Sequence, residues 1–273
     1  MRHINILGIT VALAALWGCG HRSNGADGGE TIPVEKEFVV KNDSMLYGLV
    51  CDGTSDSVVV LWPFHGDPVA YSCVEARQDG RIIGKPEIGD WTGVMVNPED
   101  TTEVTMVVDL DQLKGTWTYT VMPVMKDLQN MSKRMQRRMM ANVPDSVKET
   151  FFVPREYGFT LKRGHKAEAV GRVMRRNTLE DDSPVVYPEV KRYRQWHMSN
   201  GRLLLVSGAG TLHDGASQTV SYVVDTLDLV YMDNDSLVLE ADGVRCGFHR
   251  KQNGMKANEA AERAVERQER MER

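Results

Sequence analysis

The sequence lacks the short motifs that mark common catalytic centres. It contains no G-x-S-x-G, H-E-x-x-H, Walker A or Rossmann glycine pattern, and its seven histidines are scattered singly. The adjacent acids Asp181 and Asp182 lie in an acidic stretch, which suits solvation better than two opposed glycosidase carboxyls. We therefore predict no catalytic residues and a protein that is not an enzyme.

Cysteine is also scarce, and no cysteine has the spacing of a metal site. The four are Cys19, Cys51, Cys73 and Cys246, and no C-x-x-C or Cys/His pair has zinc spacing, so no metal or cofactor is predicted. In an oxidising compartment Cys51 and Cys73 are a candidate disulfide, because both fall in the same predicted domain. The alternative, which their alternating apolar neighbours favour slightly, is that they are small buried side chains.

Strong charge of one sign and long apolar runs are absent from the body of the chain. The 33 basic and 38 acidic residues give a net charge of −5, so neither nucleic acid nor an anionic membrane field is implied. After the N-terminal segment there is no apolar run of the roughly eighteen residues that a spanning helix needs. Nucleic-acid partners and further membrane spans are not expected.

The N-terminus does carry an apolar run, Ile4 to Trp17, after a short positive start. It ends in Leu16-Trp17-Gly18-Cys19, which resembles the lipobox of bacterial lipoproteins, although Trp17 stands where that family prefers a small residue. The resemblance implies a signal peptide over 1–18, lipid (palmitate) on Cys19, a tether over 19–35 and an outer-membrane location in the cell envelope. The alternative is an ordinary signal peptide without lipid.

Residues 36–125 show the period-two alternation of half-buried strands, separated by turn residues. Strands are expected at Met45–Cys51, Ser57–Trp62, Val69–Ala76, Trp91–Val96, Val104–Leu110 and Thr116–Met122. The run Tyr47-Gly48-Leu49-Val50, then Asp56-Ser57-Val58-Val59-Val60 and Ile88-Gly89-Asp90 resembles an OB-type barrel, similar to that of envelope-stress lipoproteins of the copper-homeostasis type. The resemblance implies a small antiparallel barrel.

Residues 126–150 change to a helical pattern. Leu128, Met131, Met135 and Met139 recur at spacings of three and four, with Lys and Arg over much of the remaining surface. The favoured interpretation is a helical linker whose apolar stripe packs on a barrel. A methionine-rich surface for a partner and a basic helix on anionic headgroups remain alternatives.

Residues 151–252 return to strands, with Asn200-Gly201 and Asp242-Gly243 as strong hairpin signals. Strands are expected at Tyr157–Lys162, Ala167–Met174, Val190–Met198, Arg202–Ser207, Thr219–Val224, Thr226–Met232, Ser236–Ala241 and Val244–Arg250. Consecutive hairpins with one apolar face predict an up-and-down barrel, filled rather than hollow because its inward candidates, Trp196 among them, are large.

This part also resembles a known family. Gly158-Phe159-Thr160-Leu161, Tyr193-Arg194-Gln195-Trp196 and Asp235-Ser236-Leu237-Val238-Leu239 occur in the order found in lipocalin-like envelope lipoproteins of anaerobic Gram-negative bacteria. The fold expected for the whole chain is all-β, with two barrels joined by the helical linker and a charged helical tail over 253–273. The function expected is a membrane-anchored binding or sensing module for a small apolar ligand or an envelope protein. A structural component with solid barrels is the alternative.

Overall fold

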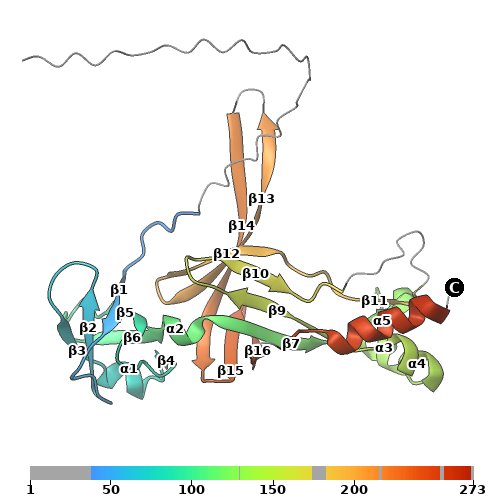
Figure 1. The fold of residues 1–273 in the computed structure, drawn as a ribbon, viewed down its shortest axis with the longest axis horizontal. Coiled ribbons are helices and arrows are strands. Elements are labelled where there is room, and N and C mark those ends of the chain that lie inside the picture. The colour runs from blue at the N-terminus through green and yellow to red at the C-terminus, as the bar shows by residue number, and fades with distance from the viewer. Residues whose placement is uncertain (1–37, 129, 174–182, 215–216, 253–254, 272–273) are drawn as a thin grey trace, which may run out of the picture. The chain divides into compact units, whose positions relative to one another are not determined.

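The computed structural model describes residues 38–128, 130–173, 183–214, 217–252 and 255–271 (Figure 1), without the side chains of 209–221, 268 and 271. The expected signal peptide, Cys19 and the tether lie outside the described residues. Within the described residues no helix is both long enough and apolar enough to span a membrane.

A six-stranded sheet, here called the small sheet, forms the first part of the described chain. Its strands are β1 (Met45–Val50), β2 (Val58–Pro63), β3 (Val69–Ser72), β4 (Ile82–Ile83), β5 (Trp91–Val96) and β6 (Val104–Asp109), with α1 (Val74–Gln78) after β3. The order is β3-β2-β1-β5-β6-β4, antiparallel except that β4 runs parallel to β6. A parallel bridge between Ser72 and Glu103 links the end of β3 to the segment before β6, so the sheet is curled and partly closed. Its OB-like identity stays a prediction.

The second sheet has eight strands and nearly closes into a barrel. The strands are β7 (Gly115–Val121), β9 (Arg155–Leu161), β10 (Ala167–Val170), β12 (Tyr193–Ser199), β13 (Arg202–Asp214), β14 (Ser217–Met232), β15 (Ser236–Ala241) and β16 (Val244–Lys251). They pair in the order β10-β9-β7-β16-β15-β14-β13-β12. The two edge strands meet at a bridge between Lys166 and Gln195, and the Trp196 N–H donates to the His165 carbonyl at 2.8 Å. Around the barrel the strands follow chain order, so the all-β class and the up-and-down topology are confirmed.

The hairpin turns of this barrel lie where the sequence predicts them. Asn200 and Gly201 have φ values of 49° and 77°, and Asp242 and Gly243 have 50° and 75°. Positive φ at both central residues defines the type I′ turn, whose twist matches that of the flanking strands. Asn, Asp and Gly adopt this conformation most readily, so local sequence determines these two connections.

The barrel includes one strand that the sequence analysis placed in the first domain. β7, expected as part of 36–125, pairs with β9 on one side and β16 on the other. The helices α3 (Lys133–Met140) and α4 (Asp145–Phe151) therefore interrupt the barrel between β7 and β9 and do not link two separate barrels. The expected strands 219–224 and 226–232 are one long strand, β14. Period-two alternation identifies the buried face of a strand but not its partner, which explains both differences.

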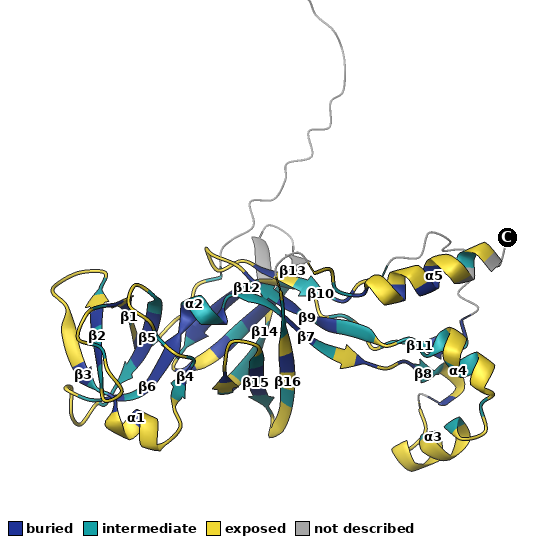
Figure 2. Ribbon diagram, turned by 60° about the horizontal axis from the view of Figure 1, so that its bottom comes forward, coloured by how far each residue is buried: buried dark blue, intermediate teal, exposed yellow. Residues whose placement is uncertain are grey.

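The methionine stripe does not pack on a barrel. Leu128, in the 3₁₀ helix η1 (Lys126–Leu128), is buried, but Met135 and Met139 on α3 are 46% and 44% exposed. No residue of α3 is buried, and Figure 2 shows this helix largely in the exposed colour. The packing predicted for 126–150 is thus wrong for its methionine face.

The C-terminal helix, by contrast, is docked by one face. α5 (Glu259–Met271) buries Ala261, Ala264 and Val265. Just before it, the Asn258 side chain accepts a hydrogen bond from the Glu156 N–H at 2.6 Å and donates to the Glu156 carbonyl at 2.9 Å. A short ribbon of β8 (Val124–Met125) and β11 (Val185–Val186) completes the described elements near the helices. The charged helical tail predicted from the sequence therefore has a buried stripe and a fixed start.

A single apolar core connects the small sheet to the barrel. It joins Met45 and Met106 of the small sheet to Met198, Leu203 and other barrel residues in one continuous cluster. The Asn200-Gly201 turn of the barrel packs closely against the small sheet. The contact is so close that a Cβ added at Gly201 would lie 2.6 Å from the Met106 Sδ. The turn also binds the segment before β1, since the Asn200 N–H donates to Asp43 at 2.9 Å.

Candidate functional site

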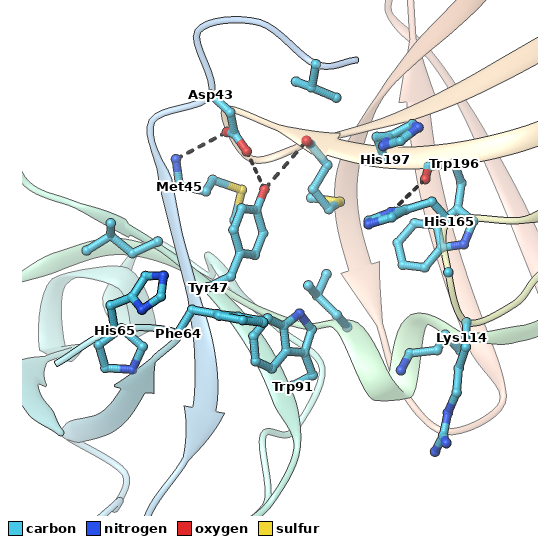
Figure 3. Close-up of a pocket in the computed structure, with 17 residues that line it drawn as sticks. Asp43, Met45, Tyr47, Phe64, His65, Trp91, Lys114, His165, Trp196 and His197 are labelled. Atoms are coloured by element: carbon cyan, nitrogen blue, oxygen red, sulfur yellow. Dashed lines mark hydrogen bonds between the residues drawn. The ribbon is translucent and has the colours of Figure 1, made fainter. Parts of the chain in front are cut away.

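A strongly apolar pocket lies where the small sheet meets the barrel, and we call it the intersheet pocket (Figure 3). Its volume is about 640 Å³, within the range of roughly 300–1,000 Å³ usual for small-molecule sites. One side comes from β1, the turn after β2, and β5. The other comes from the β9–β10 turn and β12, with α2 (Leu110–Leu113) and Lys114 between them.

Aromatic rings form two sides of the intersheet pocket. Phe64 and Trp91 pack edge to face with centroids 6.0 Å apart, and in Figure 3 Trp196 and His165 lie across the cavity from them. Phe64 is 81% exposed, whereas Trp196 is buried and its indole N–H donates to the Lys162 carbonyl at 2.8 Å. Trp196 therefore belongs to the core, as predicted, and also presents part of its ring to the pocket. Such walls suit a flat apolar group.

The one carboxylate of the lining, Asp43, accepts hydrogen bonds from three neighbours. It accepts hydrogen bonds from the Tyr47 hydroxyl at 2.5 Å, the Met45 N–H at 3.2 Å and the Asn200 N–H at 2.9 Å. Burial and the adjacent Asp43 raise the pKa of Tyr47 well above its usual value, so the phenol stays protonated and keeps donating. Asp43 therefore holds the segment before β1 against the barrel turn.

Two histidines stack at the barrel side of the pocket. The rings of His165 and His197 are nearly parallel, with centroids 4.7 Å apart. Burial, and then the neighbouring His165, lower the pKa of His197 to about 4, so this ring is neutral near pH 7. The His165 Nδ1 lies 3.2 Å from the Trp196 carbonyl, which can only accept, so Nδ1 carries the proton there.

Two cations border the same cavity, and they differ in their partners. Lys114 forms an ion pair with Asp111, whose other oxygen accepts from the Trp91 N–H at 2.7 Å. Burial alone would raise the pKa of Asp111, but these two donors, together with the charges of Lys114 and Arg163, hold it below its usual value. Arg163, on the β9–β10 turn, has no hydrogen-bond or ion-pair partner among the described residues, and its side chain is exposed.

The barrel itself is filled along most of its length. Its largest fully buried side chains include Trp117, Leu161, Leu203, Leu205, Leu237 and Leu239. A smaller cavity of about 240 Å³ remains at one part of the interior, where Tyr119 and Cys246 meet. Burial raises the pKa of Cys246, so its thiol is the protonated, unreactive form near neutral pH. The large buried side chains agree with the filled interior that the sequence favoured, except where this cavity remains.

The structure does not pair the predicted cysteines. Cys51 and Cys73 are free thiols, and Cys73 is buried in the core of the small sheet beside Tyr71, as the alternative to a disulfide expected. Cys19, the expected lipid site, lies outside the described residues. Among those that are described, no group of three or more His, Cys, Asp or Glu side chains is arranged to hold a metal ion.

The intersheet pocket is not predictable from the sequence. Its residues come from segments that are far apart in the chain, and none of them forms a motif. Two local signals were present: Phe64 and His65 precede Gly66 in a turn, and Trp196 and His197 are adjacent in one strand. An aromatic residue in an exposed turn is a weak signal of a binding surface.

Together these features define an all-β protein with an eight-stranded up-and-down barrel, a second curled sheet and a pocket between them. No protein-family model and no curated protein match the chain. Among solved structures it is similar to a lipocalin-like protein from Bacteroides thetaiotaomicron VPI-5482, with 18% identity, 50% of this chain and 95% of that chain covered, and a TM-score of 0.25. A likeness this weak supports no conclusion, so the class rests on the strand order, and the family stays a prediction.

Proposed function

We propose that this protein is a non-enzymatic binding module that holds a small, largely apolar ligand in the intersheet pocket. The observation that carries the proposal is the pocket itself: about 640 Å³, with apolar and aromatic walls and its one carboxylate already bonded. The filled barrel favours this site over the barrel interior, where about 240 Å³ is left.

The proposed location is the cell envelope, with lipid on Cys19 holding the folded body at the outer membrane. The support is the sequence Leu16-Trp17-Gly18-Cys19 and the apolar run before it. Intact-mass measurement of protein taken from native membranes tests this part separately. A diacylglyceryl or triacyl mass on a chain beginning at Cys19 supports the anchor, and an unmodified N-terminus contradicts it.

Ligand binding can be tested with the neutral fluorophore N-phenyl-1-naphthylamine. We expect saturable binding of one probe per chain, with fluorescence enhancement, because an uncharged aromatic body fits between the Phe64–Trp91 pair and Trp196. Phe64→Ala should weaken binding at little cost to folding, since Phe64 is 81% exposed. Ile88→Ala is the matched control, because Ile88 is also an exposed apolar residue of the same part of the chain but does not line the pocket. Equal affinities for both variants and the unmodified protein would contradict the site.

A second candidate function is a structural component of an envelope assembly. Exposed apolar side chains on the small sheet favour it, since Leu49, Trp62 and Val69 are all more than a third exposed. Size in mild detergent separates the two candidates. An assembly component should be extracted in a defined heavier complex, whereas a binding module should migrate as the single chain with its ligand.

A further inference from the structure

We propose that the ligand of the intersheet pocket is an anion, with an acidic group at Arg163 and a flat apolar body between the Phe64–Trp91 pair and Trp196. The inference rests on the proposed function and adds the chemical class of the ligand. It rests on which charged side chains around the cavity already have hydrogen-bond or ion-pair partners and which do not.

The negative side of the lining is a single residue that already has partners. Asp43 is the one acidic residue of the lining, and its oxygens accept hydrogen bonds from Tyr47, Met45 and Asn200. A ligand ammonium group would have to share this carboxylate with three donors that hold the segment before β1 against the barrel.

The positive side has one free group. Lys114 is bound to Asp111, so its charge is locally neutralised. Arg163 makes no ion pair or hydrogen bond with the described residues, although its charge acts on Asp111, and it is one of the residues that line the cavity. A guanidinium presents paired N–H donors in a planar fork that matches a carboxylate or a similar planar anion.

The backbone that carries Arg163 is fixed, although its side chain is exposed. Gly164 and His165 adopt φ values of 67° and 57°, and the Lys162 N–H donates to the Lys166 carbonyl at 2.8 Å across the turn. The Trp196 indole N–H binds the Lys162 carbonyl from below. The turn therefore holds the base of Arg163 beside the ring of Trp196, where a ligand acid and a ligand ring can be bound at the same time.

The neutral ring of His197 completes the site without adding charge. Burial and His165 keep His197 uncharged, and its ring stacks on His165 at the wall beside Trp196. An aromatic carboxylate thus meets one guanidinium and several ring faces, and the single carboxylate of the lining, Asp43, already accepts three hydrogen bonds.

Two probes of the same shape test the inference: 2-naphthoate, which carries the acid, and 2-naphthalenemethanol, which does not. Binding is followed by titration calorimetry or by quenching of tryptophan fluorescence. We expect the unmodified protein to prefer naphthoate by about fivefold, the upper range for a pair with an exposed partner. Arg163→Gln should bring the ratio of the two affinities close to one, and Arg163→Lys should keep part of the preference for naphthoate.

Lys166→Gln is the matched control, because Lys166 lies at the end of the same turn, is exposed and does not line the pocket. It should leave the preference intact. If both probes bind and Arg163→Gln does not change their ratio, the anion assignment is wrong while the binding function stands. If neither probe binds the unmodified protein, and N-phenyl-1-naphthylamine does not bind either, the proposed function fails first.

Discussion

Replacing Gly201 with alanine tests whether the small sheet and the barrel share one core. Gly201 is at the second central position of the β12–β13 turn, with φ at 77°, and is buried against the small sheet. A Cβ there would lie 2.6 Å from the Met106 Sδ and 2.9 Å from the Met95 Sδ. Both sulfur atoms would have to move, although methionine side chains adapt more easily than most.

The β15–β16 turn provides a control with the same backbone strain. Gly243 has φ at 75°, and a Cβ there would meet nothing within 4 Å. Gly243→Ala should therefore lower the free energy of unfolding by about 1 kcal/mol, which is what placing alanine in the left-handed conformation costs. Gly201→Ala adds overpacking, at roughly 1–2 kcal/mol more, so its total is about 2–3 kcal/mol.

Urea unfolding followed by circular dichroism measures both variants. The expected difference of about 1–2 kcal/mol corresponds to roughly 2–8 °C in Tm for a chain of this size. Equal losses for Gly201→Ala and Gly243→Ala would refute the reasoning, because they would show that the Asn200-Gly201 turn does not press on the methionines of the small sheet.

Three further predictions follow from individual contacts. The pKa of His197 is lowered to about 4, so at this residue the unfolded chain binds more protons between about pH 6.5 and 4. The contribution of His197 to stability should therefore fall by up to about 3 kcal/mol as pH drops through that window, while Asp109, whose pKa burial raises to about 6, acts in the opposite direction. The difference in unfolding free energy between the unmodified protein and His197→Gln, measured by urea titration at each pH, isolates the histidine, and a difference that does not change with pH would contradict this. Asn258→Ala removes two hydrogen bonds to the Glu156 backbone, so we expect the free energy of unfolding to fall by about 2 kcal/mol. Hydrogen exchange in α5 should become faster while exchange in the barrel stays slow. Unchanged exchange in α5 would count against its docking on the barrel. Met135→Glu should change stability by less than about 0.5 kcal/mol, because Met135 is exposed; a loss of several kcal/mol would show that the methionine stripe packs as the sequence first suggested.

Short-range features of the fold were predictable from the sequence. The Asn200-Gly201 and Asp242-Gly243 turns depend on residues that tolerate positive φ, and that preference belongs to the residues themselves. The flanking strands were also predictable from local sequence, because apolar alternation over six or eight residues indicates one buried face.

Long-range features were not predictable in the same way. β7 alternates like any strand, and only the pairing with β9 and β16, on both sides of an insertion, assigns it to the barrel. The methionine stripe of α3 has helical spacing whether or not a surface covers it, so spacing alone could not tell packing from exposure.

The intersheet pocket was the least predictable feature, because it exists only once the small sheet seats on the barrel. Phe64 and Trp196 are more than a hundred residues apart, and nothing near either one requires the other. Asp43 could be identified as an acid, but its bond to the backbone N–H of Asn200, more than a hundred residues away, could not be predicted.

Native mass spectrometry of the protein extracted from its own membranes in mild detergent tests the central claim most directly. We expect a single chain that carries one non-covalent ligand, of a size that a pocket of about 640 Å³ can hold. Unfolding should release the ligand. The Phe64→Ala variant should lose it under milder conditions than the Ile88→Ala variant. A chain that carries no small molecule and is recovered only in a defined larger complex would contradict the claim.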